Sequence, residues 1–213
     1  MYVVVYGARN HGSKAFCTYL AEHGYSLIII DSDQASLNSA EKYVHKDFEN
    51  VNIIKMKMED FDEAECLKVI KQLNKMGEII RGLVVTKNVM LNEQNSKKFE
   101  GLNFDEIHQI MHDNNEMMVG LVNVLMKPIK KSGNGFIINL RNEKYQTEED
   151  AIYWDLLYHC SSKFSTFFID SVRKAESKIL IEKINQSKTP KVHMVSVSVN
   201  YDNIKKEEEK KKL

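Results

Sequence analysis

The chain has 213 residues, of which 43% are hydrophobic, so it is long enough and apolar enough to bury a sizeable core. Its 30 basic and 30 acidic side chains cancel, which argues against a nucleic-acid-binding surface and against a polybasic membrane patch. Only 2 prolines and 9 glycines are present, which is few for a turn-rich all-β protein, so long regular elements are expected.

Short apolar runs alternate along the chain with amphipathic stretches. The first half predicts a strand at Tyr2–Tyr6, a helix over about Gly12–His23, a strand at Ser26–Ile30, a helix over Ala35–Val44, a strand at Val51–Met56 and a helix over Asp62–Met76. The second half predicts a strand at Gly82–Thr86, one long helix over Phe104–Lys130, a strand at Gly135–Leu140, a helix over Ser161–Asn185 and a strand at Val192–Val199. We therefore expect an α/β fold with a doubly wound parallel sheet of about six strands and helices on both faces.

No linker or internal repeat interrupts this alternation. A single domain over residues 1–204 is expected, followed by a charged C-terminal tail over 205–213. The long predicted helix carries an apolar stripe wider than one face of a sheet needs, formed by Met111, Met118, Leu121, Val122 and Leu125. This stripe predicts self-association, as a homodimer or as a subunit of a larger complex.

The cysteine pattern indicates a reducing compartment. Cys17, Cys66 and Cys160 are odd in number and far apart, which is typical of free thiols. The N-terminal segment lacks the basic and long apolar regions of a signal peptide, and no apolar run approaches the roughly 18 residues of a membrane-spanning helix. A cytoplasmic protein without a membrane span is expected.

The turn after the first predicted strand has the sequence GARNHGSKA, which begins at Gly7. In a Rossmann fold this turn carries glycines, because the backbone must approach the pyrophosphate of a dinucleotide at a helix N-terminus. The segment resembles G-A-x-D-G-I-G-K-A of the short-chain dehydrogenase/reductase family, in particular its hydroxysteroid dehydrogenase and 3-ketoacyl-CoA reductase branch. His11 and Ser13 stand where the second and third glycines belong, and Gly12 is one position out of register. The resemblance favours a Rossmann-type fold, and the lost glycines argue against ordinary cofactor binding.

A P-loop is the alternative interpretation of the same turn. Gly7 and Gly12 have its G-x4-G spacing, but Ser13 precedes Lys14, which reverses the order that a P-loop requires. No acidic strand end clearly supplies the magnesium partner, so the dinucleotide-type turn is the better interpretation.

The resemblance implies cofactor-binding positions at Gly7, Arg9, Gly12, Asp31, Asp60 and Asn88. Asp31 ends the second strand, where an acid binds the ribose hydroxyls of NAD and disfavours the 2′-phosphate of NADP. Asp60 corresponds to the acid that contacts the adenine ring in the family, and Asn88 lies in what remains of the family's N-N-x-G turn. Exposed acids at strand ends are the alternative interpretation of Asp31 and Asp60. The expected cofactor is none or weakly bound NAD(H), with NADP less favoured.

The family transfers a hydride between nicotinamide and a carbonyl group, with a Tyr-x3-Lys pair on one helix face, a Ser and a relay Asn. Lys163 is kept here, but His159 stands in place of the tyrosine and Asn142 in place of the serine. The relay asparagine falls at Asn114 or Asn115. Because an imidazole exchanges protons near neutral pH and an amide donates to a carbonyl oxygen, a repurposed site is an alternative to a lost one.

His108 and His112 lie four residues apart in HQIMH, which superficially resembles the H-E-x-x-H zinc motif. Gln109 replaces the general base and no third ligand is evident, so two surface histidines and no metal are expected. The sequence also ends soon after the sixth predicted strand, before the family's substrate-binding helices and seventh strand, and an incomplete substrate pocket is expected.

Losses in two separate motifs predict a catalytically inactive member of the family that acts through binding or assembly. The alternative is a divergent NAD(P)-dependent oxidoreductase acting on a steroid, acyl or other lipophilic carbonyl or alcohol substrate.

Overall fold

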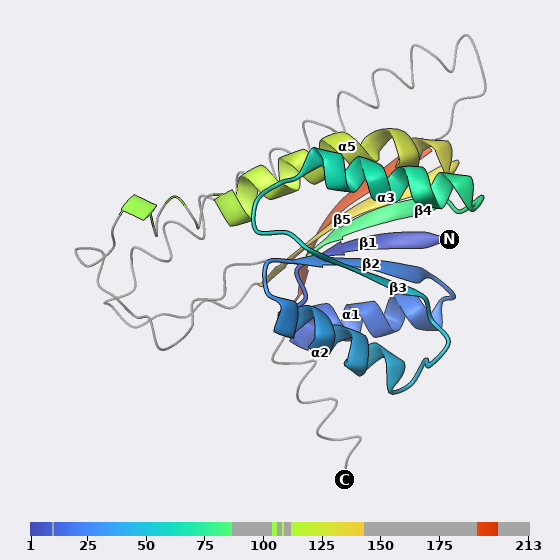
Figure 1. Ribbon diagram of the computed structural model, residues 1–213, viewed down its shortest axis with the longest axis horizontal. Coiled ribbons are helices and arrows are strands. Elements are labelled where there is room, and N and C mark those ends of the chain that lie inside the picture. The colour runs from blue at the N-terminus through green and yellow to red at the C-terminus, as the bar shows by residue number, and fades with distance from the viewer. Residues whose placement is uncertain (10, 87–103, 106–107, 109–111, 143–190, 200–213) are drawn as a thin grey trace.

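The computed structural model describes residues 1–9, 11–86, 104–105, 108, 112–142 and 191–199 (Figure 1). The first half contains β1 (Tyr2–Tyr6), α1 (His11–Glu22), β2 (Ser26–Asp31), α2 (Gln34–His45), β3 (Ile53–Lys57), α3 (Glu63–Lys75) and β4 (Ile80–Val85). In the second half a π-helical turn at His112–Glu116 leads into α5 (Met117–Lys131), which is followed by β5 (Asn134–Asn142) and β6 (Lys191–Val199).

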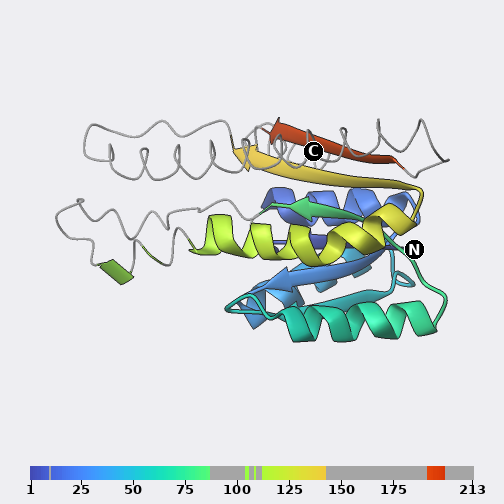
Figure 2. The ribbon, with the colours of Figure 1, turned by 90° about the horizontal axis from the view of Figure 1, so that it is seen from above.

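The strands form one parallel sheet in the order β3-β2-β1-β4-β5-β6. Helices α1 and α2 cover one face, and α3 and α5 cover the other (Figures 1 and 2). The predicted doubly wound α/β fold is therefore confirmed, and the described strands begin and end within two residues of their predicted bounds. The predicted helix over Ser161–Asn185 and the C-terminal tail lie outside the described residues.

The core has two parts because the central strands are buried on both faces. Tyr2, Val4 and Tyr6 of β1 face α3 and α5, whereas Val3 and Val5 face α1 and α2. Every residue of β1 is at most 4% exposed. This period-two alternation explains why the run YVVVY is apolar throughout.

The sequence predicts one continuous helix over Phe104–Lys130, and the structure differs. Before α5 begins at Met117, the backbone makes a π-helical turn at His112–Glu116. Asp and Asn residues dominate this turn, and their side chains compete with the backbone for hydrogen bonds, which weakens a regular helix. Single π turns inside helices are frequent at functional sites, and this one carries both candidates for the relay asparagine, Asn114 and Asn115.

The apolar stripe on α5 is used within the chain. Met118, Leu121, Val122 and Leu125 are at most 3% exposed and belong to the core between α3, α5 and the sheet. The stripe therefore covers the sheet and offers little surface to a second copy. The prediction that this stripe is free for self-association is therefore wrong for its four described residues. Met111 lies outside the described residues.

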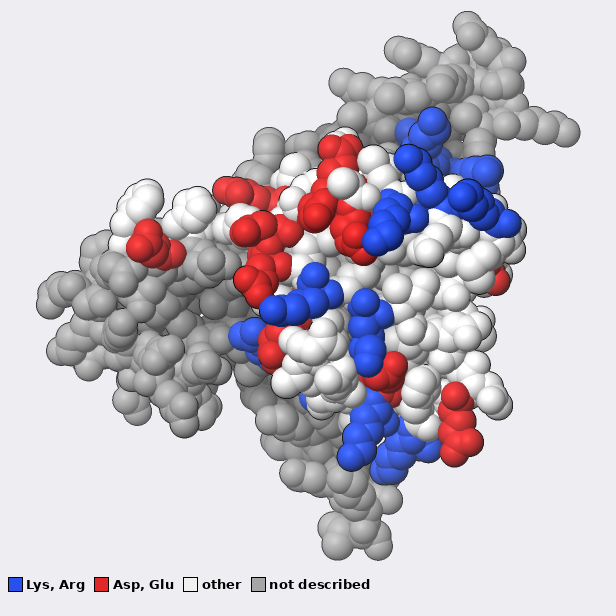
Figure 3. Space-filling view, in the orientation of Figure 1, with Lys and Arg blue, Asp and Glu red and all other residues white. Residues whose placement is uncertain are grey.

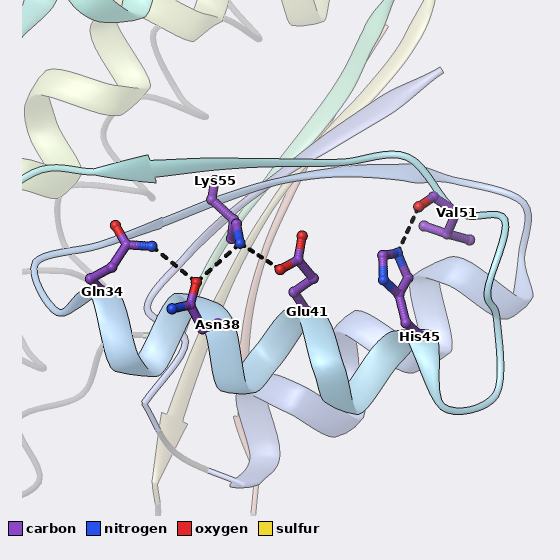
Figure 4. A network of polar contacts seen from close by, with 6 residues as sticks. All are labelled: Gln34, Asn38, Glu41, His45, Val51 and Lys55. Carbon is purple, nitrogen blue, oxygen red and sulfur yellow. Dashed lines mark hydrogen bonds and ion pairs between the residues drawn. The ribbon is translucent and has the colours of Figure 1, made fainter.

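Polar contacts tie α2 to the edge strand β3 (Figure 4). Lys55 projects from β3 and donates to Asn38 Oδ1 at 3.0 Å and to the carboxylate of Glu41. His45 Nε2 lies 3.0 Å from the carbonyl oxygen of Val51, just before β3. A lysine on an edge strand also discourages pairing with a foreign strand.

Candidate dinucleotide site

The candidate site lies where the order of the strands reverses. β2 and β3 lie on one side of β1, and β4, β5 and β6 lie on the other. In open α/β sheets, ligands bind beyond the carboxyl ends of the strands at this point. The turn after β1 and the residue after β4, Thr86, therefore border the candidate site.

The turn after β1 keeps the glycine conformation at Gly7. Gly7 has a φ of 97°, in the left-handed region that favours glycine, and its N–H donates to Ile30 O at 2.8 Å. Helix α1 then begins at His11, and the Ser13 side chain is fully buried. Ser13 stands where the family's third glycine belongs, and its side chain is accommodated inside the protein. Arg9 is exposed on the turn.

Asp31 faces the turn. Its carboxyl group has no exposed surface. Oδ2 accepts the N–H of Ala8 at 2.7 Å, and Oδ1 accepts the N–H of Asp33 at 3.0 Å. The predicted contact of Asp31 with a ribose stays a prediction, but a sugar hydroxyl would have to reach a carboxyl group whose two oxygens already accept backbone N–H groups.

Thr86 contacts the same turn from the other side. It is fully buried, and its N–H donates to Tyr6 O at 2.8 Å, which extends the pairing of β4 with β1. Its Oγ1 lies 2.5 Å from Gly7 O and 3.1 Å from Tyr6 O. In the sequence Thr86 stands out only as the end of a predicted strand, and no sequence pattern indicates these contacts.

Asp33 is a second acid in the loop after β2, and it caps α2. Its carboxylate accepts the N–H groups of Ala35 and Ser36 and the hydroxyl of Ser36. The Ser36 hydroxyl, these two N–H groups and, more weakly, the guanidinium of Arg9 hold the pKa of Asp33 below its usual value. An Asp directly before an amphipathic stretch is a recognisable N-cap signal in the sequence.

Asp60 lies in the loop between β3 and α3, and its side chain is 89% exposed. His112 Nε2, in the π-helical turn, lies 3.5 Å from Asp60 Oδ1 and 3.9 Å from Glu116 Oε2. The expectation of two surface histidines is confirmed for His108, which is exposed, and wrong for His112, which is 9% exposed. Within the described ranges, no group of three His, Cys, Asp or Glu side chains is arranged to hold a metal ion.

Acidic side chains gather around this loop. Five of the seven residues from 59 to 65 are Asp or Glu. Figure 3 shows this acidic surface over the start of α3 and α5, with Lys and Arg at the opposite ends of the helices, where Lys75, Lys130 and Lys131 lie. The loop between β3 and α3, at the carboxyl edge of the sheet, thus carries a local excess of negative charge, which Lys57 partly offsets through its 2.7 Å ion pair with Glu59.

Of the predicted catalytic residues, the structure places two by their backbone. Asn142 is the last residue of β5, at the carboxyl edge of the sheet, and Asn114 lies in the π-helical turn. The neighbouring Asn115 side chain is 6% exposed. His159, Lys163 and the cofactor-binding candidate Asn88 lie outside the described residues, so their predicted roles stay predictions.

Fold and site together define a doubly wound α/β protein with a dinucleotide-type first turn. A family model described as short chain dehydrogenase matches residues 1–166. The chain belongs to the short-chain dehydrogenase family. None of the curated proteins matches this chain.

Solved structures have the same fold at low identity. A metagenomic short-chain oxidoreductase in complex with NADP is 15% identical, with a TM-score of 0.69 over 93% of this chain and 81% of that chain. A short chain dehydrogenase from Pseudomonas syringae is 17% identical, with a TM-score of 0.66 over 93% and 75%. A betaketoacyl-[ACP] reductase from Bacteroides thetaiotaomicron is 15% identical, with a TM-score of 0.63 over 92% and 75%. At these identities the likeness shows the fold.

A helix that spans a membrane must be both long and apolar. In the part of the chain that the structure describes, no helix is long and apolar enough to cross a bilayer.

Proposed function

We propose that this chain keeps the short-chain dehydrogenase scaffold without its carbonyl chemistry, and acts through binding or assembly in the cytoplasm. The observation that carries the proposal is the burial of Asp31, the family's ribose-binding acid, whose two carboxyl oxygens accept the N–H groups of Ala8 and Asp33. The replacements at His11, Ser13, Asn142 and His159 point the same way, because they alter both the cofactor turn and the proton-transfer positions.

Electrostatics supports weak cofactor binding. A dinucleotide is anionic. The acidic residues from 59 to 65 lie in the loop that would contact its adenosine end and in the first turn of α3. Charges within a Debye length of about 8 Å repel an anion at physiological ionic strength. The residues present therefore do not fit a tightly held dinucleotide. NAD(H) would bind weakly or not at all, and NADP, with one more phosphate, would bind less well.

The second candidate is a divergent NAD(P)-dependent oxidoreductase for a steroid, acyl or other lipophilic carbonyl or alcohol compound, as in the hydroxysteroid dehydrogenase and 3-ketoacyl-CoA reductase branch. The preserved Gly7 conformation at the strand-order reversal favours it, as does the fold shared with an oxidoreductase in complex with NADP. In this candidate His159, Lys163, Asn142 and Asn114 occupy the catalytic positions.

Calorimetric titration of the full chain with NADH and with NADPH separates the two candidates. We expect a dissociation constant of about 1 mM or higher for each cofactor, so that the binding free energy is no more favourable than about −4 kcal/mol. Low-micromolar binding of either cofactor, together with turnover of a lipophilic ketone or acyl substrate, would select the oxidoreductase.

Assembly is tested separately. A homodimer, or a subunit of a larger complex, is the form that we propose for a non-catalytic member. Sedimentation equilibrium at high micromolar concentration should show a species above the monomer mass. A strict monomer there would remove the homodimer from the proposal.

A further inference from the structure

One peptide group in the first turn is held by two side chains from opposite sides. The carbonyl oxygen of Gly7 and the N–H of Ala8 belong to the same peptide unit and point in opposite directions because that unit is trans. Thr86, after β4, donates its hydroxyl to the carbonyl at 2.5 Å. Asp31, at the end of β2, accepts the N–H at 2.7 Å. The peptide thus lies between the two strands that flank β1.

Beyond Gly7 the backbone of the turn no longer pairs with β2 and β4, and the side chains of Asp31 and Thr86 supply the hydrogen bonds instead. Up to Gly7 the pairing uses the backbone, since Gly7 N–H donates to Ile30 O and Thr86 N–H donates to Tyr6 O, each at 2.8 Å. The positive φ of Gly7 then turns the chain away from strand geometry. Without these two side chains, the next peptide would be buried with an unsatisfied N–H and an unsatisfied carbonyl oxygen, which is unfavourable.

We propose that Asp31 and Thr86 are positioning residues of the β1–α1 turn, and that Asp31 does not select between NADH and NADPH. This inference goes beyond the proposed function, because it assigns both roles whether or not a dinucleotide binds. It also gives Gly7, in the turn, and Asp31, at the end of β2, a structural role that does not depend on the two lost glycines: their contacts hold the turn that leads into α1.

Amide hydrogen exchange of the full chain, without any cofactor, tests the positioning roles. In Asp31→Asn the new amide group has a single acceptor oxygen for the two N–H groups of Ala8 and Asp33. Exchange at Ala8 should accelerate about tenfold or more, while exchange at Val4 in the middle of β1 should change less than about threefold. The matched control is Asp33→Asn in the same loop, which keeps its own backbone N–H on Asp31 and should leave Ala8 unchanged.

Thr86 provides a milder pair of variants that should both fold. Thr86→Val keeps the shape and removes the hydroxyl, so Ala8 exchange should accelerate, whereas Thr86→Ser keeps the hydroxyl and should restore near wild-type exchange. Unchanged Ala8 protection in both Asp31→Asn and Thr86→Val would overturn the positioning roles. A valine variant that is protected as well as the serine variant would overturn the role of Thr86.

Cofactor titration addresses the selectivity part. If wild type binds measurably, Asp31→Asn should weaken NADH and NADPH by the same factor, within about twofold. A gain of tenfold or more in relative NADPH affinity would overturn this part. Tight NADH binding by wild type would contradict the proposed function alone, and Ala8 exchange would still decide the roles of Asp31 and Thr86.

Discussion

The ring of Phe61 lies directly over Gly120 of α5. A Cβ atom at position 120 would come within 2.6 Å of the ring's Cγ and within 2.7 Å of both Cδ atoms. Phe61 follows Asp60 in the loop between β3 and α3, so this contact holds that loop against α5. The φ angle of Gly120 is not positive, so its backbone conformation does not require glycine. Glycine is required there because the ring of Phe61 lies so close.

Gly120→Ala should destabilise the protein. The clash with Phe61 costs about 1–3 kcal/mol, and the better helix propensity of alanine returns up to about 1 kcal/mol. A net loss of about 1–2 kcal/mol should lower the Tm by roughly 2–8 °C, measured by thermal denaturation. Asn123→Ala, at an exposed position of the same helix, is the matched control and should change the free energy of unfolding by less than about 0.5 kcal/mol.

A double variant shows whether the ring is the cause. Phe61→Leu should cost less in the Gly120→Ala background than in wild type, because the smaller side chain relieves the clash. Stabilisation by Gly120→Ala alone would contradict the contact.

Asp33 should make α2 sensitive to acid. Its pKa is below the usual 3.8, mainly through the Ser36 hydroxyl, so its contribution to stability is present above about pH 4 and is lost as pH falls through the lowered pKa. Asp33→Asn keeps a capping oxygen and does not titrate, so the stability difference between wild type and variant should shrink as pH falls below about 4.

NMR titration of the Asp33 carboxyl provides the direct measurement. Ser36→Ala should raise its pKa toward the usual value, since the largest cause of the shift is removed. An Asp33 carboxyl in wild type that titrates at or above 3.8 would contradict the prediction.

The two described cysteines should be unreactive in the folded protein. Burial raises the pKa of Cys17 to about 12, and burial followed by the nearby acids Asp62, Glu65 and Glu63 raises that of Cys66 to about 11. In a Cys160→Ser background at pH 8, a chromogenic disulfide reagent should label neither thiol until guanidinium unfolds the chain, and then should label both. Rapid labelling of the native protein would show that one of these sites opens.

Both thiols also predict a loss of stability at alkaline pH. Their folded pKa values are raised above the unfolded value of 9.0, so their contribution is complete below that pH and declines as pH rises toward 11 and 12. Replacing Cys17 by alanine should flatten this decline in the free energy of unfolding.

Restoring only the catalytic side chains should not create a reductase. His159→Tyr with Asn142→Ser should give no turnover with NADH or NADPH, because His11 and Ser13 still alter the cofactor turn. Adding His11→Gly and Ser13→Gly is the comparison, and this is the combination from which activity could return. Turnover from the first two changes alone would show that cofactor binding had survived.

The sequence alone determined the architecture, because its evidence is local and periodic. The run Tyr2–Tyr6 is apolar at every position, as a strand buried on both faces must be, and β1 has those bounds. The same local evidence predicts altered cofactor and catalytic positions at His11, Ser13, Asn142 and His159, since they follow recognisable strands and spacings. It missed the π-helical turn at His112–Glu116, because a pattern of apolar spacing does not report the backbone hydrogen bonds of one turn.

Only the tertiary structure decided what Asp31 faces. Asp31 and Ala8 are 23 residues apart, and Thr86 and Gly7 are 79 apart. Their contacts exist because β2 and β4 both pair with β1, which is a property of strand order. An acid at a strand end has the same local sequence whether it binds a ribose or a backbone N–H. Which of the two it meets depends on the conformation of the neighbouring turn, and here the positive φ of Gly7 presents the Ala8 N–H to it.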